Sequence, residues 1–546
     1  MDSTKKADGL CTKKKLYSIF SSATVITWAV ATATILVLLL FFHENVEYMC
    51  KTTFGLSNFV LLMIGIVTVA SLSALYVFRK KGINAFFIKI KLRYVILATA
   101  VLLGLQLFVF YNIYFKSGWD VRMIIQAAEA TAVGNTDITS SDSQLWYFAL
   151  YPNNLLITWV FSVIIRICNA VGVVSEFSHI FVIIIVQCIL FAVSSVLVFN
   201  IVKKLLPNPV MPFVAWGLYW LHIGFNPHLT ITYSDAFSLI FPISALSIYQ
   251  AIENRRFIIL KWSLIAVLSF IGFKVKPQVM IMLIAIILYD LVKLACKYDT
   301  KTKLAHAIGY CVGAIAICLL SAVCDIGLSK LPVRLDENDV MGLPHFLMMG
   351  FNEETGGVYS EDDVNFSDQF ETADERAEAN IAMFKERVKK LGFSGLVKFL
   401  AKKCMTNFGN GTYAWSVEGT FYYTILEEKN STISPFLRSF YYEGGENYLT
   451  FITLQHYLWL IILVGNFGVI FVLKDKNRRE KLALPVLALI GLSLFEMIFE
   501  ARARYFFNFS PIFIITASVG WYAMIKATVD HLNKLKAKTH KKEDAE

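Results

Sequence analysis

Long apolar stretches separated by short polar segments make up most of the chain between residues 17 and 526. Each stretch approaches the roughly 20 residues that an α-helix needs to cross the hydrocarbon core of a bilayer. The pattern therefore predicts an all-α polytopic membrane protein with about 12 transmembrane helices. The predicted spans are 17–42, 54–78, 94–115, 177–202, 209–225, 236–251, 259–273, 277–296, 305–328, 452–473, 482–498 and 505–526.

The segment 152–171 is long enough to cross the membrane, but the charge distribution argues against a crossing. If it lies along the membrane, the later loops that share a side with the termini carry roughly 18 Lys and Arg, and the opposite short loops roughly 4. A crossing would invert this ratio and put most of these Lys and Arg outside. Lys and Arg in short loops normally stay on the cytoplasmic side, so a crossing is disfavoured. We therefore predict an interfacial or re-entrant helix, with Arg166 reaching polar surroundings and both termini in the cytoplasm.

This topology predicts interfacial helices in the first large outer loop and a mixed outer subdomain later in the chain. The acidic first half of that subdomain favours a solvated face over a metal site, because it lacks EF-hand spacing, and 371–404 reads as a helix. The predicted units are 1–93, an N-terminal tail with two added transmembrane helices; 94–328, a transmembrane core with outer loop 116–176; 329–451, the extracytoplasmic subdomain; 452–526, the C-terminal transmembrane helices; and 527–546, a basic cytoplasmic tail.

Composition agrees with a membrane protein and narrows its partners. The chain is 56% hydrophobic and only 17% charged, whereas soluble domains are about one quarter charged. The net charge of +10 does not indicate nucleic acid, because the basic residues cluster at the ends of spans, where they set topology. The nine cysteines show no CxxC spacing, so they suggest neither a disulfide framework nor a zinc site. The sequence has no Walker loop or GxGxxG unit, which argues against a cytoplasmic nucleotide site. We expect a multi-pass protein of the plasma membrane whose partner is the lipid bilayer.

Asp120 lies where an apolar stretch ends, in Lys116-Ser-Gly-Trp-Asp120. Ionisable residues near a bilayer are costly and are functional candidates by default, although Asp120 could simply cap the first helix of the outer loop. Asp235 begins a later span and could likewise only complement a helix dipole. If both carboxylates face one cavity, they could activate an acceptor hydroxyl or hold a divalent metal.

Cationic residues occur at two further predicted outer turns. Lys274 and Lys276 flank a short turn, and Arg502 and Arg504 follow Glu500 at another. Lys and Arg are strong phosphate partners. Snorkelling to the interface could explain the lysines, and an internal ion pair with Glu500 could explain one arginine. Several cations on one predicted side of the membrane nevertheless favour an anionic ligand.

The order of these features resembles the C-type (GT-C) membrane glycosyltransferases, most closely the family 39-like branch with protein O-mannosyltransferases and the lipid A aminoarabinose transferase. The resemblance covers residues 94–300 and, more loosely, 482–526. The motifs that carry it are Asp120 in the first outer loop, Tyr151-Pro152 at the interfacial helix, Ser175-Glu-Phe177 at the next span, Ser234-Asp235, Lys276-Pro277 and Arg504-Tyr505.

This resemblance implies a glycosyltransferase that takes its sugar from a polyprenyl-phosphate-linked donor. Asp120 would be the general base of an inverting transfer, and Asp235 would orient the site or share a divalent metal, the one cofactor that we consider. The acceptor would be an extracytoplasmic glycopolymer, lipid or protein of the cell envelope. The donor phosphate would bind Lys274, Lys276, Arg502 and Arg504, and the cavity would include Tyr151 and Glu500.

Two other functions stay open from the sequence. A polysaccharide polymerase or ligase would also use lipid-linked substrates, but it would not share the pattern of an Asp in the first outer loop. A transporter or flippase of lipid-linked sugars would be expected to show internal repeats and broken helices near the middle of the membrane. The sequence shows no convincing repeat, and its candidate charges lie at the predicted outer rim.

Overall fold

The computed structural model describes residues 2–42, 53–134, 147–415, 417, 422–425 and 429–543. Parts of the predicted outer segments, 135–146, 418–421 and 426–428, lie outside the described residues. The elements are α1 (Asp2–Phe41), α2 (Asn58–Lys89), α3 (Leu92–Ile113), β1 (Phe115–Ser117), α4 (Trp119–Val133), α6 (Leu155–Ala170), α7 (Glu176–Leu205), α8 (Met211–Tyr219), α9 (Ser234–Phe237), α10 (Ile240–Ala251), α11 (Ile258–Val275), α12 (Met280–Cys296), α13 (Thr300–Leu328), α14 (Gly342–Met349), α15 (Glu361–Asp368), α16 (Ala373–Phe408), β2 (Tyr422–Ile425), α17 (Ile433–Tyr441), α18 (Tyr448–Phe467), α19 (Lys476–Ile498) and α20 (Ser510–Glu543).

Eleven helices within the described residues are long and apolar enough to cross a membrane. All but one of them coincide with spans predicted from the sequence. The exception is Pro152–Ala170, the segment that the charge distribution assigns to the interface. The chain is therefore an all-α polytopic membrane protein, as its apolar stretches predict.

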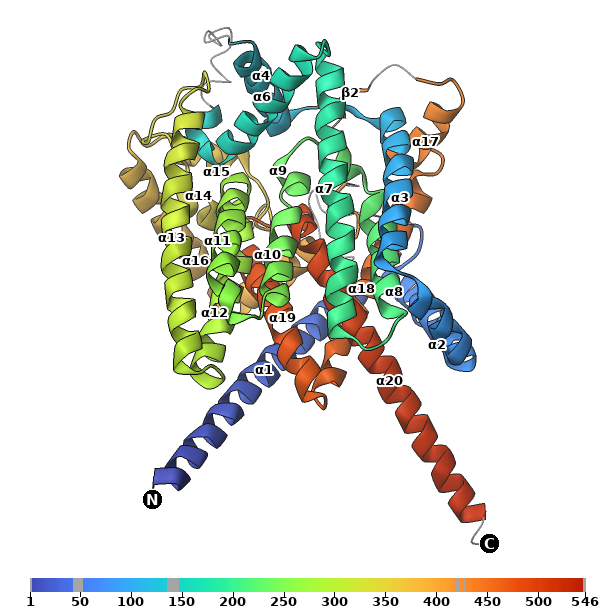
Figure 1. Ribbon diagram of the computed structural model, residues 1–546. Helices are drawn as coiled ribbons and strands as arrows, with labels where there is room; N and C mark the ends of the chain where they lie inside the picture. The colour runs from blue at the N-terminus through green and yellow to red at the C-terminus, as the bar shows by residue number, and fades with distance from the viewer. Residues whose placement is uncertain are drawn as a thin grey trace.

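The segment that contains α6, between α3 and α7, starts and finishes at the same end of the bundle. Lys116, which follows α3, forms an ion pair with Glu176, the first residue of α7. The end of α3 and the start of α7 therefore meet, and the residues between them make no net crossing. Figure 1 shows α4 and α6 together at this end, here called the α4 end, with both termini at the opposite end, here called the terminal end. This arrangement agrees with an interfacial helix over 152–171.

Cysteine labelling tests this topology in cells. Val133 and Val174, on either side of α6, are 69% and 74% exposed. In a background without the native cysteines, we expect Val133→Cys and Val174→Cys to react with a membrane-impermeant maleimide from the same side. Lys301→Cys, at the start of α13, should react only from the other side. Labelling of positions 133 and 174 from opposite sides would show that α6 crosses the membrane.

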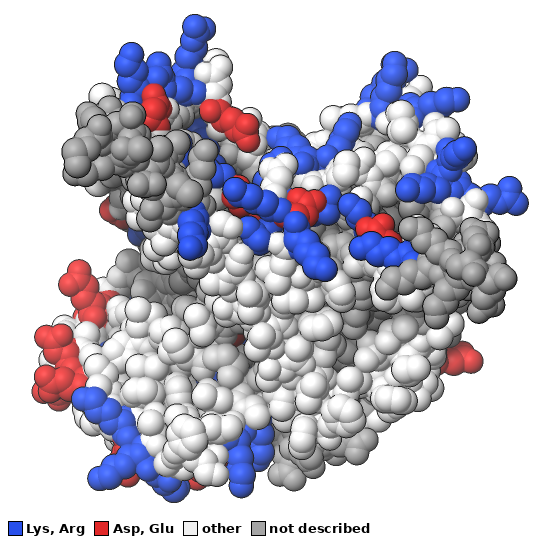
Figure 2. Space-filling view, turned by 90° about the horizontal axis from the view of Figure 1, so that it is seen from below, with Lys and Arg blue, Asp and Glu red and all other residues white. Residues whose placement is uncertain are grey.

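Basic loops gather at the terminal end. Arg479 Nη2 donates to Ser18 Oγ at 2.6 Å, and Lys297 Nζ donates to Glu480 Oε2 at 2.6 Å. These contacts place the start of α19 beside α1, and the loop before α13 beside the start of α19. Seen from below, Lys and Arg side chains gather on part of this face, next to a broad area without charged side chains (Figure 2). That this end faces the cytoplasm stays a prediction.

Two predicted spans, 209–225 and 236–251, differ from full-length membrane helices. α8 continues only as a π-helical turn to Gly224, and α10 has 12 residues. At 1.5 Å per residue α10 is about 18 Å long, well short of the roughly 30 Å hydrocarbon core. Pro227 starts a separate 3₁₀ turn between them, because proline cannot continue the hydrogen-bond ladder of α8. The connecting segment is irregular but enclosed, as such backbone must be at membrane depth; its buried polar residues are Asn226, His228, Thr230, Thr232, Ser234, Asp235 and Ser238.

The segment 329–451 packs onto the bundle. The predicted helix over 371–404 is α16, whose backbone breaks at Gly392 with φ 59°, a conformation that glycine tolerates. At its far end the Phe408 ring lies 4.4 Å from that of Phe506. In the acidic part, Asp363 Oδ1 accepts from Arg387 Nη2 at 2.6 Å, so this carboxylate serves an internal ion pair. α16 thus carries its last turns into the core beneath the α4 end.

The first helix packs against the last ones. Trp28 Nε1 of α1 donates to Asn466 Oδ1 of α18 at 3.0 Å. α18 and α20 approach so closely that a Cβ on Gly520 would lie 1.9 Å from the Gly465 carbonyl oxygen. Small residues at such crossings let membrane helices pack without a hydrophobic driving force between them. The hydrogen bond therefore joins α1 to α18, and the glycine contact joins α18 to α20.

Candidate functional site

Asp120 is placed at the α4 end by a turn with unusual backbone geometry. The N-cap of α4 is Gly118, and the following Trp119 has φ 52°, a left-handed value that is strained for a bulky residue. Asp120 is therefore in the first helical turn, but its Oδ2 accepts a hydrogen bond from Tyr233 Oη at 2.7 Å. Strain of this kind is typical of functional sites, and the carboxylate faces a distant segment as well as its own helix.

Asp235 and Lys276 form a buried ion pair. Lys276 Nζ donates to Asp235 Oδ1, and the two side chains are only 8% and 6% exposed. Asp235 lies on the single turn of α9, and Lys276 lies at the C-cap of α11, where the chain turns before Pro277. A buried charge needs a partner of this kind, because isolated it would cost several kcal/mol. The pair thus fixes the irregular segment before α10 against the end of α11.

Two tyrosine rings connect this pair with Arg504. Lys276 Nζ lies 6.0 Å from the centroid of the Tyr233 ring and 4.7 Å from that of Tyr505. Arg504 Cζ lies 5.9 Å and 5.4 Å from the same two centroids. Cation–π contacts at these distances stabilise both charges. Asp120, Tyr233, Asp235, Lys276 and Arg504 are hereafter called the carboxylate–cation cluster.

Tyr233 is held in its neutral form within this cluster. Burial, and next the Asp120 carboxylate, raise the pKa of Tyr233 well above 10. Its hydroxyl therefore stays protonated and acts as the donor in the hydrogen bond to Asp120. An acceptor hydroxyl that displaced this bond would find the carboxylate already oriented.

The remaining predicted residues of the cavity lie beside the cluster. Arg502 Nε lies 3.5 Å from Glu500 Oε1, and these side chains are 8% and 11% exposed. Burial is the main cause that raises the pKa of Tyr151 above its usual value, and Tyr359, Asp120 and Glu500 add to it. Tyr151 therefore lies near carboxylates from α4 and from the turn after α19, as a shared cavity requires.

Lys274 is the one predicted residue that the structure does not bring to this cluster. Its Nζ lies 5.8 Å from the Phe270 ring centroid, one helical turn earlier, and its charge acts on Cys324 of α13. Lys274 is in the last turn of α11, whereas Lys276 is the C-cap of that helix with extended backbone, and the two side chains contact different partners. Lys274 therefore lies apart from the cluster, and its part in phosphate binding stays a prediction.

Three residues close to the cluster, Gln278, Lys403 and Glu496, were not among the predicted site residues. Gln278 Nε2 donates to Glu496 of α19, which is fully buried and lies near Lys276. Lys403 Nζ donates to the carbonyl oxygens of Gly350, at 2.6 Å, and Phe499. Burial lowers the pKa of Lys403 to about 7 despite the nearby Glu496 and Glu500. The position of Glu496 inside an apolar stretch is the signal that could have identified it.

No group of three or more His, Cys, Asp or Glu side chains within the described residues is arranged to hold a metal ion. Asp120 and Asp235 could still contribute oxygen ligands to a hard cation together with substrate phosphate, as Mg²⁺ sites often do. The side chains of the cluster also support a reaction that needs no metal ion. A half-buried carboxylate can take a proton, and adjacent cations can stabilise a phosphate.

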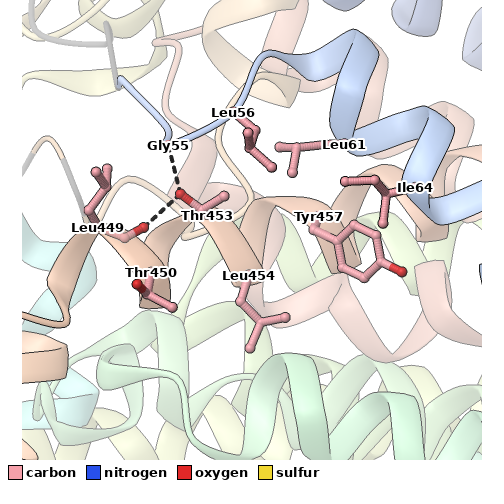
Figure 3. A pocket seen from close by; sticks show the side chains of 9 residues that line it. All are labelled: Gly55, Leu56, Leu61, Ile64, Leu449, Thr450, Thr453, Leu454 and Tyr457. Atoms are coloured by element: carbon pink, nitrogen blue, oxygen red, sulfur yellow. Dashed lines mark hydrogen bonds between the residues drawn. The ribbon is translucent and has the colours of Figure 1, made fainter.

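An open apolar groove lies on another flank of the bundle. It has a volume of about 530 Å³, and Gly55 N donates to Thr453 Oγ1 at 2.8 Å at one end of it (Figure 3). None of its lining residues is charged, so it offers none of the chemistry of the cluster; these residues are Gly55, Leu56, Leu61, Ile64, Leu449, Thr450, Thr453, Leu454 and Tyr457.

Fold and site together define a polytopic α-helical integral membrane protein with a cluster of carboxylates and cations at one end of its bundle. The chain belongs to the family described as conserved hypothetical integral membrane protein, whose family model matches residues 11–525. This match runs from α1 into α20 and includes every residue of the carboxylate–cation cluster. No curated protein matches the chain.

Proposed function

We propose that the protein is a membrane glycosyltransferase that moves a sugar from a polyprenyl-phosphate-linked donor to an extracytoplasmic acceptor. The observation that carries this proposal is that Asp120, Asp235, Lys276 and Arg504, which are far apart in the sequence, converge at one end of the bundle. Each has the chemistry expected of a base, an orienting carboxylate or a phosphate-binding cation. We also propose that this end faces away from the cytoplasm, across the plasma membrane from both termini.

In the proposed reaction, the acceptor hydroxyl oxygen attacks the anomeric carbon of the donor sugar. Asp120 takes the hydroxyl proton as the new glycosidic bond forms. The bond between the anomeric carbon and the phosphate oxygen breaks, and its electron pair leaves with the lipid phosphate. Lys276 and Arg504 stabilise that charge. A single displacement of this kind inverts the anomeric configuration.

Loss of the protein is expected to remove one sugar from a cell-envelope glycan or glycoprotein. Mass spectrometry would compare envelope glycans and glycoproteins from cells with and without the gene, and from cells complemented with the wild-type chain. The expected result is a mass loss of one sugar residue that complementation restores. Identical glycan and glycoprotein profiles in all three strains would refute the proposed transfer.

Transport of a lipid-linked sugar is a second candidate, favoured by the interrupted helices α8 and α10. Short helices around an enclosed irregular segment are typical of transporter binding sites. The two functions differ in their products. In proteoliposomes a transporter would move labelled lipid-linked sugar across the membrane without a new glycosidic bond, whereas the transferase would consume it only when an acceptor is present.

A further inference from the structure

A second buried polar cluster lies at the terminal end, remote from the proposed reaction. Tyr249 lies in the last turn of α10, Lys261 lies in the first turn of α11, and Lys293 and Tyr298 lie around the end of α12. These four residues are hereafter called the tyrosine–lysine cluster. Its end of the bundle is fixed by α1, because Tyr17 Oη donates to Tyr289 Oη at 2.7 Å. The proposed transfer uses none of these residues.

The two lysines of this cluster converge on one ring. Lys261 Nζ lies 3.7 Å and Lys293 Nζ 5.4 Å from the centroid of Tyr249. Lys293 Nζ also lies 5.3 Å from the ring centroid of Tyr298. Cation–π contacts partly stabilise such charges. They leave two like charges close together, however, which is unfavourable unless an anion joins them.

Neighbouring carboxylates do not complete the pairing. Asp290 accepts hydrogen bonds from Tyr249 at 2.6 Å, from His306 at 2.6 Å and from Tyr310 at 2.7 Å. Within the described residues no carboxylate oxygen lies within 4.0 Å of either lysine, although Lys261 is only 3% exposed. The carboxylates of Asp290 and Glu253 act on both lysines from a distance, but an ammonium group that is buried without a directly bound anion is costly. The site therefore calls for an external anion.

The surroundings favour an anion that belongs to the membrane. Lys261 and Lys293 each lie about 4.5 Å along the axis from a helix end, at 1.5 Å per residue. We expect this to be the level of the headgroups, because the ends of spanning helices lie near the edge of the hydrocarbon core. Beside them the surface is apolar, with Ile259 and Leu260 42% and 50% exposed. Basic pockets between membrane helices at such a level bind anionic lipid headgroups. Acyl chains would lie along α11 and α13.

We propose that Lys261 and Lys293 bind the phosphate of an anionic phospholipid headgroup, with Tyr249 and Tyr298 packed around the two ammonium groups. Asp290 is a positioning residue in this site, because its hydrogen bond holds the Tyr249 ring that both lysines contact. This inference does not depend on the glycosyl-transfer reaction.

Lipid enrichment tests this site directly. The full-length protein is reconstituted in nanodiscs of phosphatidylglycerol and phosphatidylcholine, and native mass spectrometry measures the lipids that remain bound. We expect retained phosphatidylglycerol in the wild type and about tenfold weaker retention in Lys293→Gln and Lys261→Met, because each removes a charged contact of about 1.4 kcal/mol or more. Lys301 is an exposed lysine at the start of α13, also at the terminal end. The control variant Lys301→Gln should retain phosphatidylglycerol as the wild type does.

The outcomes separate the sources of the phosphate. Unchanged retention in both cluster variants would overturn the proposal. Lys293 is only half-buried, so Lys293→Gln alone decides the matter if Lys261→Met does not fold. Inorganic phosphate is added to lipid-depleted protein as a second probe, with the thermal midpoint as readout. A midpoint raised by phosphate but not by phosphatidylglycerol would overturn the assignment to a lipid.

Discussion

Asp120→Asn is expected to lower the rate of sugar transfer at least about a hundredfold, because a general base of this kind contributes roughly 10²- to 10⁴-fold. The asparagine keeps the size of the side chain and can still accept from Tyr233, whose hydroxyl lies 2.7 Å from the carboxylate. It cannot take the proton of the acceptor hydroxyl. The measurement is the amount of glycan product in cells that express equal amounts of membrane-inserted variant and wild type.

Glu129→Gln is the matched control for this variant. Glu129 lies on the same helix but accepts from His179 Nδ1 at 2.7 Å, away from the carboxylate–cation cluster. Loss of that carboxylate should leave transfer within about threefold of wild type, since a part-exposed contact contributes little. Normal transfer by Asp120→Asn would remove Asp120 from the mechanism, and equal losses in both variants would indicate a structural cause.

Lys276→Met is expected to destabilise the protein by about 3–5 kcal/mol, since it leaves the Asp235 carboxylate buried without its partner. The side chains of this pair are 8% and 6% exposed, so water cannot replace the lost ammonium group. The double variant Asp235→Asn/Lys276→Met should recover most of that stability, because it removes both charges. It should still be inactive, because the leaving phosphate loses a cation.

Unfolding in detergent gives the stability readout, and the glycan assay gives the activity. Lys116→Met is the matched control, because it breaks the Lys116–Glu176 pair, whose side chains are 27% and 40% exposed. A pair of that exposure should contribute less than about 1 kcal/mol. If Lys276→Met were as stable as wild type, the buried pair would not exist as described. Full activity in the double variant would exclude Lys276 from phosphate stabilisation.

The parts of the fold that follow from hydropathy and charge could be predicted from the sequence. Apolar length identified the long spans, and the distribution of Lys and Arg kept α6 at one end, where length alone would have made it cross. Apolar length could not show that α8 and α10 stop short. The end of α8 depends on Pro227, and both helices depend on the surrounding bundle, which encloses the polar groups of the connecting segment.

The candidate site followed from residue type and place for Asp120, Asp235, Lys276 and Arg504. The partner Tyr233 could not be predicted, because it resembles an ordinary interfacial aromatic in the sequence. Tyr505 entered only as part of the Arg504-Tyr505 motif. Lys274 shows the opposite problem. Its type and place matched those of Lys276, and only the end of α11 at Val275, which leaves Lys276 in an extended turn, distinguishes them.

The hydrogen bond between Trp28 and Asn466 also constrains how the protein is made. These residues are 438 positions apart, so at 5–20 residues per second α1 waits roughly 20 to 90 seconds for its partner during synthesis. Throughout that interval the tryptophan N–H must find another acceptor or remain unsatisfied in the bilayer. Assembly of the bundle is therefore completed only after translation has passed α18, and a chain truncated before α18 would leave the Trp28 N–H without the acceptor that Asn466 provides.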